Sequence, residues 1–273
     1  MPSDRSREVS KGRFVSLVEI DMKFAFKSIV VAAAFVAAGA ANAASVTVDN
    51  VLSAGDQYVV SGGGALTFSA NLRNALNVGS VAASAFGGAD SQIVGLAGAY
   101  TDITVSAPIT SVTYDSVTNQ VISVKTAGGA RQDAIVKAGV SNGGWVEVGN
   151  LDVNLQTKEI FGTIVGQSLA GVNVNWSGKL FTFGTLAGDT VFQEGTALTQ
   201  INTLALTTAG FAEIKKALDL QFLGDVSLQA AAADFGNINS SLTVTAVPEP
   251  STYALMGLGL VGIGFAARRR ASK

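Results

Sequence analysis

The stretch WVEVGNLDVNLQTKEIFGTI, residues 145–164, carries the pattern that decides the fold. Leucine and valine at positions 151, 153 and 155 alternate with asparagine and aspartate, the chain turns over 156–158, and a second alternating run follows from 160 to 164. Apolar side chains at every second residue lie on one face of a strand. The stretch therefore predicts an antiparallel β-hairpin with one buried face.

Similar alternating runs recur on both sides of this hairpin. A second hairpin is predicted from residues 109–114 and 121–125, with its turn at 115–119. Turn-forming residues separate the remaining runs, as expected between the strands of an all-β domain. These runs predict further strands at 45–51, 57–61, 65–70, 101–105, 172–176, 179–185, 199–206 and 241–245.

One segment has the helical period instead. Phe211, Ile214 and Leu218 share a helical face, and Thr207 or Thr208 can cap the start, so a helix is predicted over 208–218. Residues 72–78 are a second helical candidate, and 81–98 are too rich in small residues to assign. The predicted fold is mainly β, an antiparallel β-sandwich or partly open β-barrel with one short helix.

Charge divides the chain into three parts. Residues 44–247 carry eight Lys and Arg against fifteen Asp and Glu, whereas 1–43 and 248–273 are each net positive. The central part is long enough for one domain with its own hydrophobic core. Its acidity argues against nucleic acid as a partner, because phosphate binding needs clustered Lys and Arg.

Cysteine and histidine are both absent from the sequence. Without cysteine there is neither a disulfide framework nor a thiolate metal site. Without histidine the chain lacks the side chain that most often serves as a general base near neutral pH. The sequence therefore predicts no catalytic residue, no metal ligand and no cofactor.

The N-terminal region has the three-part pattern of a secretory signal peptide. Lys23 and Lys27 form a basic start, residues 29–40 are apolar, and the small residues Ala41 and Ala43 mark a cleavage site before Ala44. Residues 22–43 are predicted to form a signal helix; a buried N-terminal helix is the alternative. Residues 1–21 are either an extended leader or reflect a start codon assigned ahead of Met22.

The C-terminal region combines three features. Pro248, Glu249 and Pro250 precede an uncharged segment at 251–267, and Arg268, Arg269 and Arg270 follow it. The uncharged segment has 17 residues, close to the minimum for a transmembrane helix. Arginines directly after such a helix favour the cytoplasmic side. The pattern predicts a C-terminal transmembrane helix with the domain 44–247 outside the cytoplasm.

This tail resembles the PEP-CTERM sorting tail of exported proteins in Gram-negative bacteria. The resemblance covers residues 248–273 and implies processing by a membrane-embedded exosortase near the Pro-Glu-Pro signature. It further implies transient membrane anchoring, release to the cell surface or extracellular matrix, and an association with exopolysaccharide and biofilm. An ordinary C-terminal anchor is the alternative.

Two further motif matches fail on their context. Residues 139–143 spell the G-x-S-x-G nucleophile elbow, but that serine requires a histidine base, so a turn is the better interpretation. Residues 257–262 spell the dinucleotide fingerprint G-x-G-x-x-G, but they lie inside the apolar tail. Glycines there favour close helix packing or access for a processing enzyme.

Acidic side chains leave two possibilities open. A pair of carboxylates can hydrolyse a glycosidic bond without histidine, and the candidate pairs are Glu147 with Asp152 and Asp189 with Glu194. The alternative is that these four side chains lie on a solvated surface. Acidic loops also leave a calcium site open, although the sequence contains no EF-hand loop.

Three functions are consistent with these features. The preferred prediction is a non-enzymatic cell-surface or extracellular-matrix protein associated with secreted polysaccharide. The second is a carbohydrate-binding or adhesive module, in which Trp145 and Trp176 could stack on sugar rings; packing at the core or rim is the alternative for both. The third is a glycoside hydrolase with two carboxylates.

Overall fold

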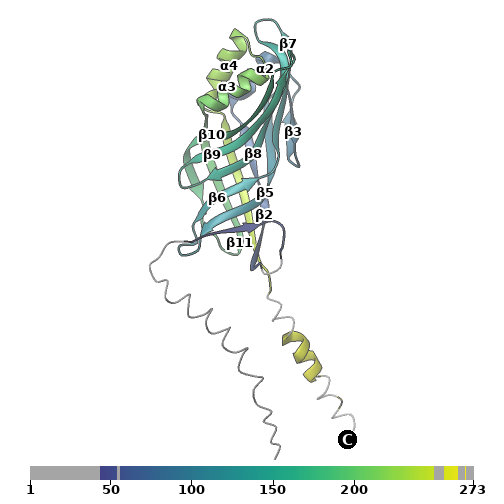
Figure 1. Ribbon diagram of the computed structural model, residues 1–273, viewed down its shortest axis with the longest axis vertical. Helices are drawn as coiled ribbons and strands as arrows, with labels where there is room; N and C mark the ends of the chain where they lie inside the picture. Colours follow the sequence, from purple (N-terminus) through teal and green to yellow (C-terminus); the bar gives the residue numbers. More distant parts are fainter. Residues whose placement is uncertain (1–43, 54–55, 249–254, 264–267, 269–273) are drawn as a thin grey trace, which may run out of the picture. The chain divides into compact units, whose positions relative to one another are not determined.

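The computed structural model describes residues 44–53, 56–248, 255–263 and 268. Within these residues, one sheet of twelve strands is antiparallel throughout, and three helices lie at one end of it (Figure 1). The strands are β1 (Ser45–Asp49), β2 (Tyr58–Phe68), β3 (Ala82–Phe86), β4 (Asp90–Val94), β5 (Asp102–Asp115), β6 (Val121–Thr126), β7 (Gly129–Lys137), β8 (Ser141–Asn154), β9 (Glu159–Ser168), β10 (Asn173–Gly188), β11 (Gly195–Leu206) and β12 (Gly236–Ala246). The helices are α2 (Ala70–Gly79), α3 (Thr208–Ala217) and α4 (Phe222–Ala232).

The sheet closes on itself as a barrel. Strands β5, β2, β12, β11, β10, β9 and β8 are neighbours in that order, and β6 pairs with both β8 and β5 to complete the ring. The remaining strands extend from it: β1 and β4 pair with β5, β7 pairs with β8, and β3 pairs with β7. The mainly β prediction is confirmed, but the strands form a closed barrel rather than a sandwich or an open one.

Strand β8, the first half of the hairpin quoted above, makes this closure possible. Its first part pairs with β7 as far as Gly149, and its second part pairs with β6 from Asp152. One extra residue lies between these parts relative to β9, and Asn150 adopts a left-handed backbone with φ of 50°. Such a bulge bends a strand and raises its twist. The bend lets one strand serve two neighbours in succession.

The bulge also preserves the apolar face of β8. Val146 and Val148 are buried before it, whereas Val153 is buried after it and Leu151 packs against the core. The inward positions therefore change from even to odd numbers at Asn150. The extra residue shifts the alternation by one position, so apolar side chains point inward on both sides of the bend. The predicted alternation of 151–155 and its turn to β9 are confirmed.

Three predicted strand breaks do not exist in the structure. Residues 172–176 and 179–185 fall mostly in the single strand β10. Residues 57–61 and 65–70 mostly belong to the single strand β2, and 101–105 and 109–114 belong to β5. Proline normally interrupts a ladder because it lacks an N–H. Pro108 lies where β5 changes partner from β4 to β6, since Ser106 pairs with Asp90 and Ile109 with Thr126. The missing N–H of Pro108 therefore lies between the β4–β5 ladder and the β5–β6 ladder.

The helices close one end of the barrel. Their buried residues, including Leu76, Ile214 and Leu228, belong to the same hydrophobic cluster as the barrel residues Phe68 and Phe181. The fold prediction of one short helix was wrong in number, because α2 and α4 accompany the predicted α3, although α2 confirms the second helical candidate at 72–78. Helix α4 gives little sequence signal: Gln221 precedes it without a side-chain cap, and its apolar residues surround the helix.

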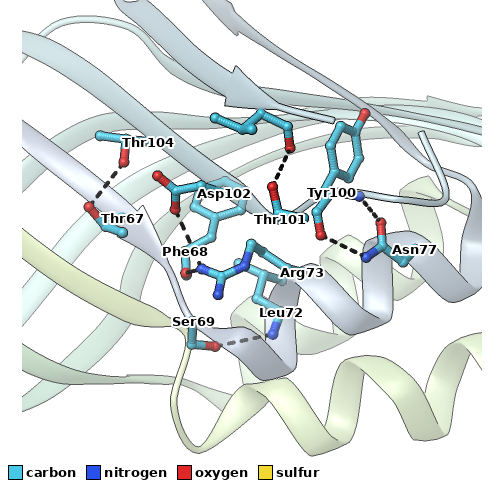
Figure 2. Close-up of polar contacts among 11 residues, drawn as sticks. Thr67, Phe68, Ser69, Leu72, Arg73, Asn77, Tyr100, Thr101, Asp102 and Thr104 are labelled. Atoms are coloured by element: carbon cyan, nitrogen blue, oxygen red, sulfur yellow. Dashed lines mark hydrogen bonds and ion pairs between the residues drawn. The ribbon is translucent and has the colours of Figure 1, made fainter. Parts of the chain in front are cut away.

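Polar contacts fix α2 on the barrel rim (Figure 2). Ser69 caps the helix by accepting a hydrogen bond from the backbone of Leu72 at 3.1 Å. Arg73 donates to the carbonyl of Phe68 at 2.6 Å and lies 3.6 Å from the Asp102 carboxylate. The Asn77 amide bonds both backbone groups of Tyr100, at 2.7 and 3.1 Å. These contacts hold the helix on β2 and on the segment before β5.

Much of the two predicted end segments lies outside the described residues. The leader at 1–21, the signal peptide at 22–43, and Glu249, Pro250, Arg269 and Arg270 fall there. Of the predicted membrane segment, residues 255–263 are described, and they are helical and exposed. Within the described part of the chain, no helix has the length and apolar character to span a membrane.

Replacing Gly149 tests the closure of the barrel. A Cβ on Gly149 would lie 2.3 Å from the carbonyl oxygen of Gly128, so Gly149→Ala forces two backbones apart where β8 changes partner. We expect a loss of about 1–3 kcal/mol in the free energy of unfolding, measured in urea. Gly184→Ala is the matched control, because its Cβ would meet Thr203 at an ordinary 3.5 Å. Equal stability of the two variants would contradict this account.

Candidate functional site

Three adjacent strands form a wall without any charged residue. β2, β12 and β11 are neighbours in the sheet, and none of them contains Asp, Glu, Lys or Arg. Their inward residues are mostly apolar, including Val60, Ile238 and Leu204. Thr199 and Ser240 also line the interior, where their hydroxyls bond to each other. Their outward residues are mainly Ser, Thr, Asn and Gln. We call this outer surface, together with the adjoining Ser106 of β5 and Ala187 and Gly188 of β10, the uncharged wall.

A groove lies in the uncharged wall. Direct strand partners place Ser106, Ala65, Asn239, Gln200 and Ala187 in one row across five strands, from β5 to β10. The groove around this row has a volume of about 540 Å³. That is within the range of small-molecule sites. Glycines at 63, 64 and 188 also line it, and without side chains they leave the backbone accessible.

The polar side chains of the groove differ from those around it in their bonding. Beside it, hydroxyl groups pair across strands: Thr67 with Thr104 at 3.1 Å, and Thr196 with Thr243 at 2.9 Å. Among the described residues, no hydrogen bond is formed by the amides of Asn239 and Gln200, both of which are exposed. The groove therefore presents amide donors and acceptors that remain available for a ligand.

The barrel interior offers much less space. A cavity of about 80 Å³ lies among apolar side chains such as Leu66, Val153 and Ile201. An engineered protein cavity that accommodates benzene has about 150 Å³. The interior cavity is therefore smaller than that engineered site and much smaller than the groove.

Two of the four candidate carboxylates lie beside cations, and Glu194 is exposed. Glu147 faces outward, as predicted, and pairs with Arg131 at 3.0 Å, whereas Asp152 lies 3.8 Å from Lys125. Asp189 follows Gly188 in a loop, as predicted, and accepts a hydrogen bond from the backbone of Val191. Neither the groove nor the interior cavity is lined by two carboxylates. Among the described residues no cluster of three acidic groups could hold a metal ion.

The two tryptophans have different environments. Trp176 packs against the main hydrophobic cluster, in agreement with the packing alternative. Trp145 lies beside the guanidinium of Arg131, which is 4.3 Å from its ring centroid. Asp133 and Glu147 hold Arg131 in turn, and hydrogen bonding to Asp133 is the main cause that raises the pKa of the guanidinium. An ion-paired arginine thus covers one face of the Trp145 ring.

The G-x-S-x-G match is a turn, as predicted. Gly139 and Gly143 have positive φ angles of 73° and 93°. Ser141 between them is buried, and its hydroxyl donates to the carbonyl of Leu218 at 2.6 Å. This bond ties the start of β8 to the end of α3, so the serine has a structural role.

Both ends of the barrel domain lie opposite the helices. At the C-terminal end, Ala246 pairs with Tyr58, and the Val247 N–H donates to Gln57 at 2.8 Å. At the N-terminal end, Ser45 pairs with Asp115. A cluster of three rings joins the two regions, since Phe192 stacks on Tyr114 at 4.0 Å between centroids and lies perpendicular to Tyr58 at 5.6 Å. Burial, followed by the neighbouring Tyr58, raises the pKa of Tyr114.

The sorting signature begins directly at this end. Pro248 is exposed and follows the last backbone bond of the domain by one residue. Ala44 and Arg268 are also exposed, whereas Ala41, Ala43 and the remaining signature residues lie outside the described part. The uncharged wall itself was missed from the sequence. Its signal was the absence of charge in 58–68, 195–206 and 236–246, but only the sheet order shows that these strands are adjacent.

Comparisons with known proteins identify the tail. The PEP-CTERM protein-sorting motif matches residues 246–270, which confirms the predicted resemblance. The chain is thus an exported protein with a tail that directs exosortase processing and sorting to the cell surface. No curated protein matches the chain.

Among solved structures, the chain is similar to the crystal structure of the C-terminal domain of HtaA from Corynebacterium glutamicum. The identity is 10% and the TM-score 0.41, over 68% of this chain and 99% of that one. A likeness at this level has no bearing on function.

The turn after β5 makes a testable contribution to stability. Hydrogen bonds from the backbones of Thr118 and Val117 lower the pKa of Asp115. A carboxylate with a lowered pKa stabilises the fold above its unfolded value of about 3.9, and this contribution is lost as the pH falls through the folded pKa. Asp115→Asn should therefore lower the thermal midpoint at pH 7, and the difference should vanish near pH 2.

Asp90→Asn is the control for this experiment, because Asp90 is exposed and forms no hydrogen bond among the described side chains. The thermal midpoints of the natural protein, Asp115→Asn and Asp90→Asn are compared from pH 2 to 7. A difference between Asp115→Asn and the natural protein that stays constant with pH would refute the assignment.

Proposed function

We propose that residues 44–247 form a non-enzymatic cell-surface or matrix protein that associates with secreted polysaccharide. The observation that carries this proposal is the uncharged wall, because its outward hydroxyl and amide groups suit hydrated contacts with a polyhydroxylated polymer. The sorting tail supplies the destination. Cleavage before Ala44 and processing near Pro248 would leave the barrel as the mature protein.

The absence of an enzymatic role is part of the proposal. The chain has no histidine or cysteine, and the outward carboxylates Glu147 and Asp152 each lie beside a cation. A general acid for glycoside hydrolysis needs a raised pKa and a second carboxylate across the scissile bond. These features favour a binding or structural role over the hydrolase alternative.

We further propose that the chain is anchored in the membrane only until its tail is processed. The segment 251–267 would hold the chain in the membrane, and Arg268, Arg269 and Arg270 would keep its end in the cytoplasm. Because Val247 still bonds to Gln57, the exosortase would meet the Pro-Glu-Pro signature immediately beside the folded barrel. The proposed order is export, anchoring, processing and release to the surface or matrix.

Removing the signature should block this sequence of events. The triple variant Pro248→Ala, Glu249→Gln, Pro250→Ala keeps the apolar segment and the arginines, so we expect export without processing. Cell fractionation with immunoblotting should find the variant in the membrane with its tail intact. The natural chain should be shorter and at the surface or in the medium. Normal release of the triple variant would refute the role of these residues.

Association with polysaccharide can be tested in the producing cells. Size-exclusion chromatography of the secreted fraction should place the protein with the polymer, well ahead of its own elution volume. In a strain that lacks the polymer, the protein should elute at the volume of the free chain. Elution at that volume in both strains would contradict the proposed function.

A further inference from the structure

We infer that the groove of the uncharged wall binds a segment of a neutral polysaccharide chain. This inference rests on the proposed function for its setting, but it names the site and the chemical class of the ligand. It concerns the row of Ser106, Ala65, Asn239, Gln200 and Ala187 and its immediate surroundings.

Charge decides the class of polymer. No lysine or arginine lines the groove, so an anionic polymer would lose its hydration without gaining a cation. The charged residue at the end of the row is Asp90 on β4, whose strand partner is Ser106 on β5. Its carboxylate would repel an acidic sugar. A neutral sugar carries no such penalty. The groove therefore favours neutral over anionic chains.

Hydrogen-bonding capacity matches the same ligand. A sugar hydroxyl both donates and accepts, and a carboxamide offers both functions on adjacent atoms. Asn239 and Gln200 are direct partners on β12 and β11, so two such amides lie side by side. The hydroxyls of Ser106 and Ser241 also line the groove. Among the described residues, none of these four side chains forms a hydrogen bond with the protein.

The backbone gives the groove its depth and rigidity. Gly63 and Gly188 lack side chains, and Ala65 and Ala187 have small ones, so a ring can approach the sheet itself. Gly63 and Ala65 are paired on both sides, with β5 and β12, and Ala187 and Gly188 are paired with β11, so the sheet holds their geometry without a ligand. Binding would therefore order few protein groups, and the associated entropic cost is small.

No aromatic residue lines the groove, so stacking does not contribute to binding. Affinity for a single chain segment should consequently be low, and retention in a polymer would depend on repeated contact along the chain. A method that detects weak, polymer-dependent binding is therefore needed. Affinity electrophoresis in native gels that contain soluble polysaccharide meets this requirement.

The test uses the processed protein recovered from cells, in gels with dextran, galactomannan or xylan, and with alginate as the anionic comparison. We expect retardation by at least one neutral polymer and none by alginate. The double variant Asn239→Ala, Gln200→Ala should lose most of the retardation by the neutral polymer. Ala65→Leu, which fills the groove and keeps both amides, should have the same effect.

The matched control removes the same chemistry elsewhere. Gln229 on α4 and Asn175 on β10 are exposed outside the groove, so Gln229→Ala, Asn175→Ala should be retarded like the natural protein. Circular dichroism checks that every variant is folded. Unchanged retardation of both groove variants, retardation by alginate alone, or no retardation by any neutral polymer would overturn the inference.

Failure of the inference can be told apart from failure of the proposed function. If the groove variants still elute with the secreted polymer from cells, the protein associates with it through another surface, and only the inference is wrong. If the natural protein itself does not elute with the polymer, the proposed function is wrong.

Discussion

The structure depends on a close approach of two backbones where β8 changes partner. Gly128 and Gly149 lie so near each other that a side chain on Gly149 would meet the Gly128 carbonyl, and the amide of Asn150 bonds to Gly128 at 2.9 Å. This corner turns the chain from β6 into β7 and bends β8. Because β6 then reaches both β5 and β8, the ring closes. A closed ring leaves no open edge within it.

Closure separates two chemical surfaces. Apolar side chains line the inside, where the cavity has a volume of about 80 Å³, so the interior serves stability. Function is left to the outside, where β2, β12 and β11 carry no charge. Charged residues do occur on β7 and β8, where Arg131 is paired with Asp133 and Glu147. The uncharged wall therefore offers polar groups that are available to a ligand.

Sequence patterns predicted the hairpins and α3 because strict alternation and a threonine cap are local signals. Strand β7 was missed since its inward residues include Ala130 and Gln132, which are small or polar. Pro108 suggested a break that the change of partner removes. The candidate groove needs five strands to come together from residues 65 to 239, and no local pattern encodes that register. The tail was identified from sequence because its signals are contiguous.

The sorting motif and the fold meet at Val247, whose bond to Gln57 ends the barrel immediately before Pro248. The central claim is that both ends of the chain direct its export while the barrel is the part that remains. Mass spectrometry of both termini of the protein recovered outside the cells tests this claim most directly. The account predicts an N-terminus at Ala44 and a C-terminus close to Pro248. A full-length chain found in the cytoplasm, with both ends intact, would contradict it.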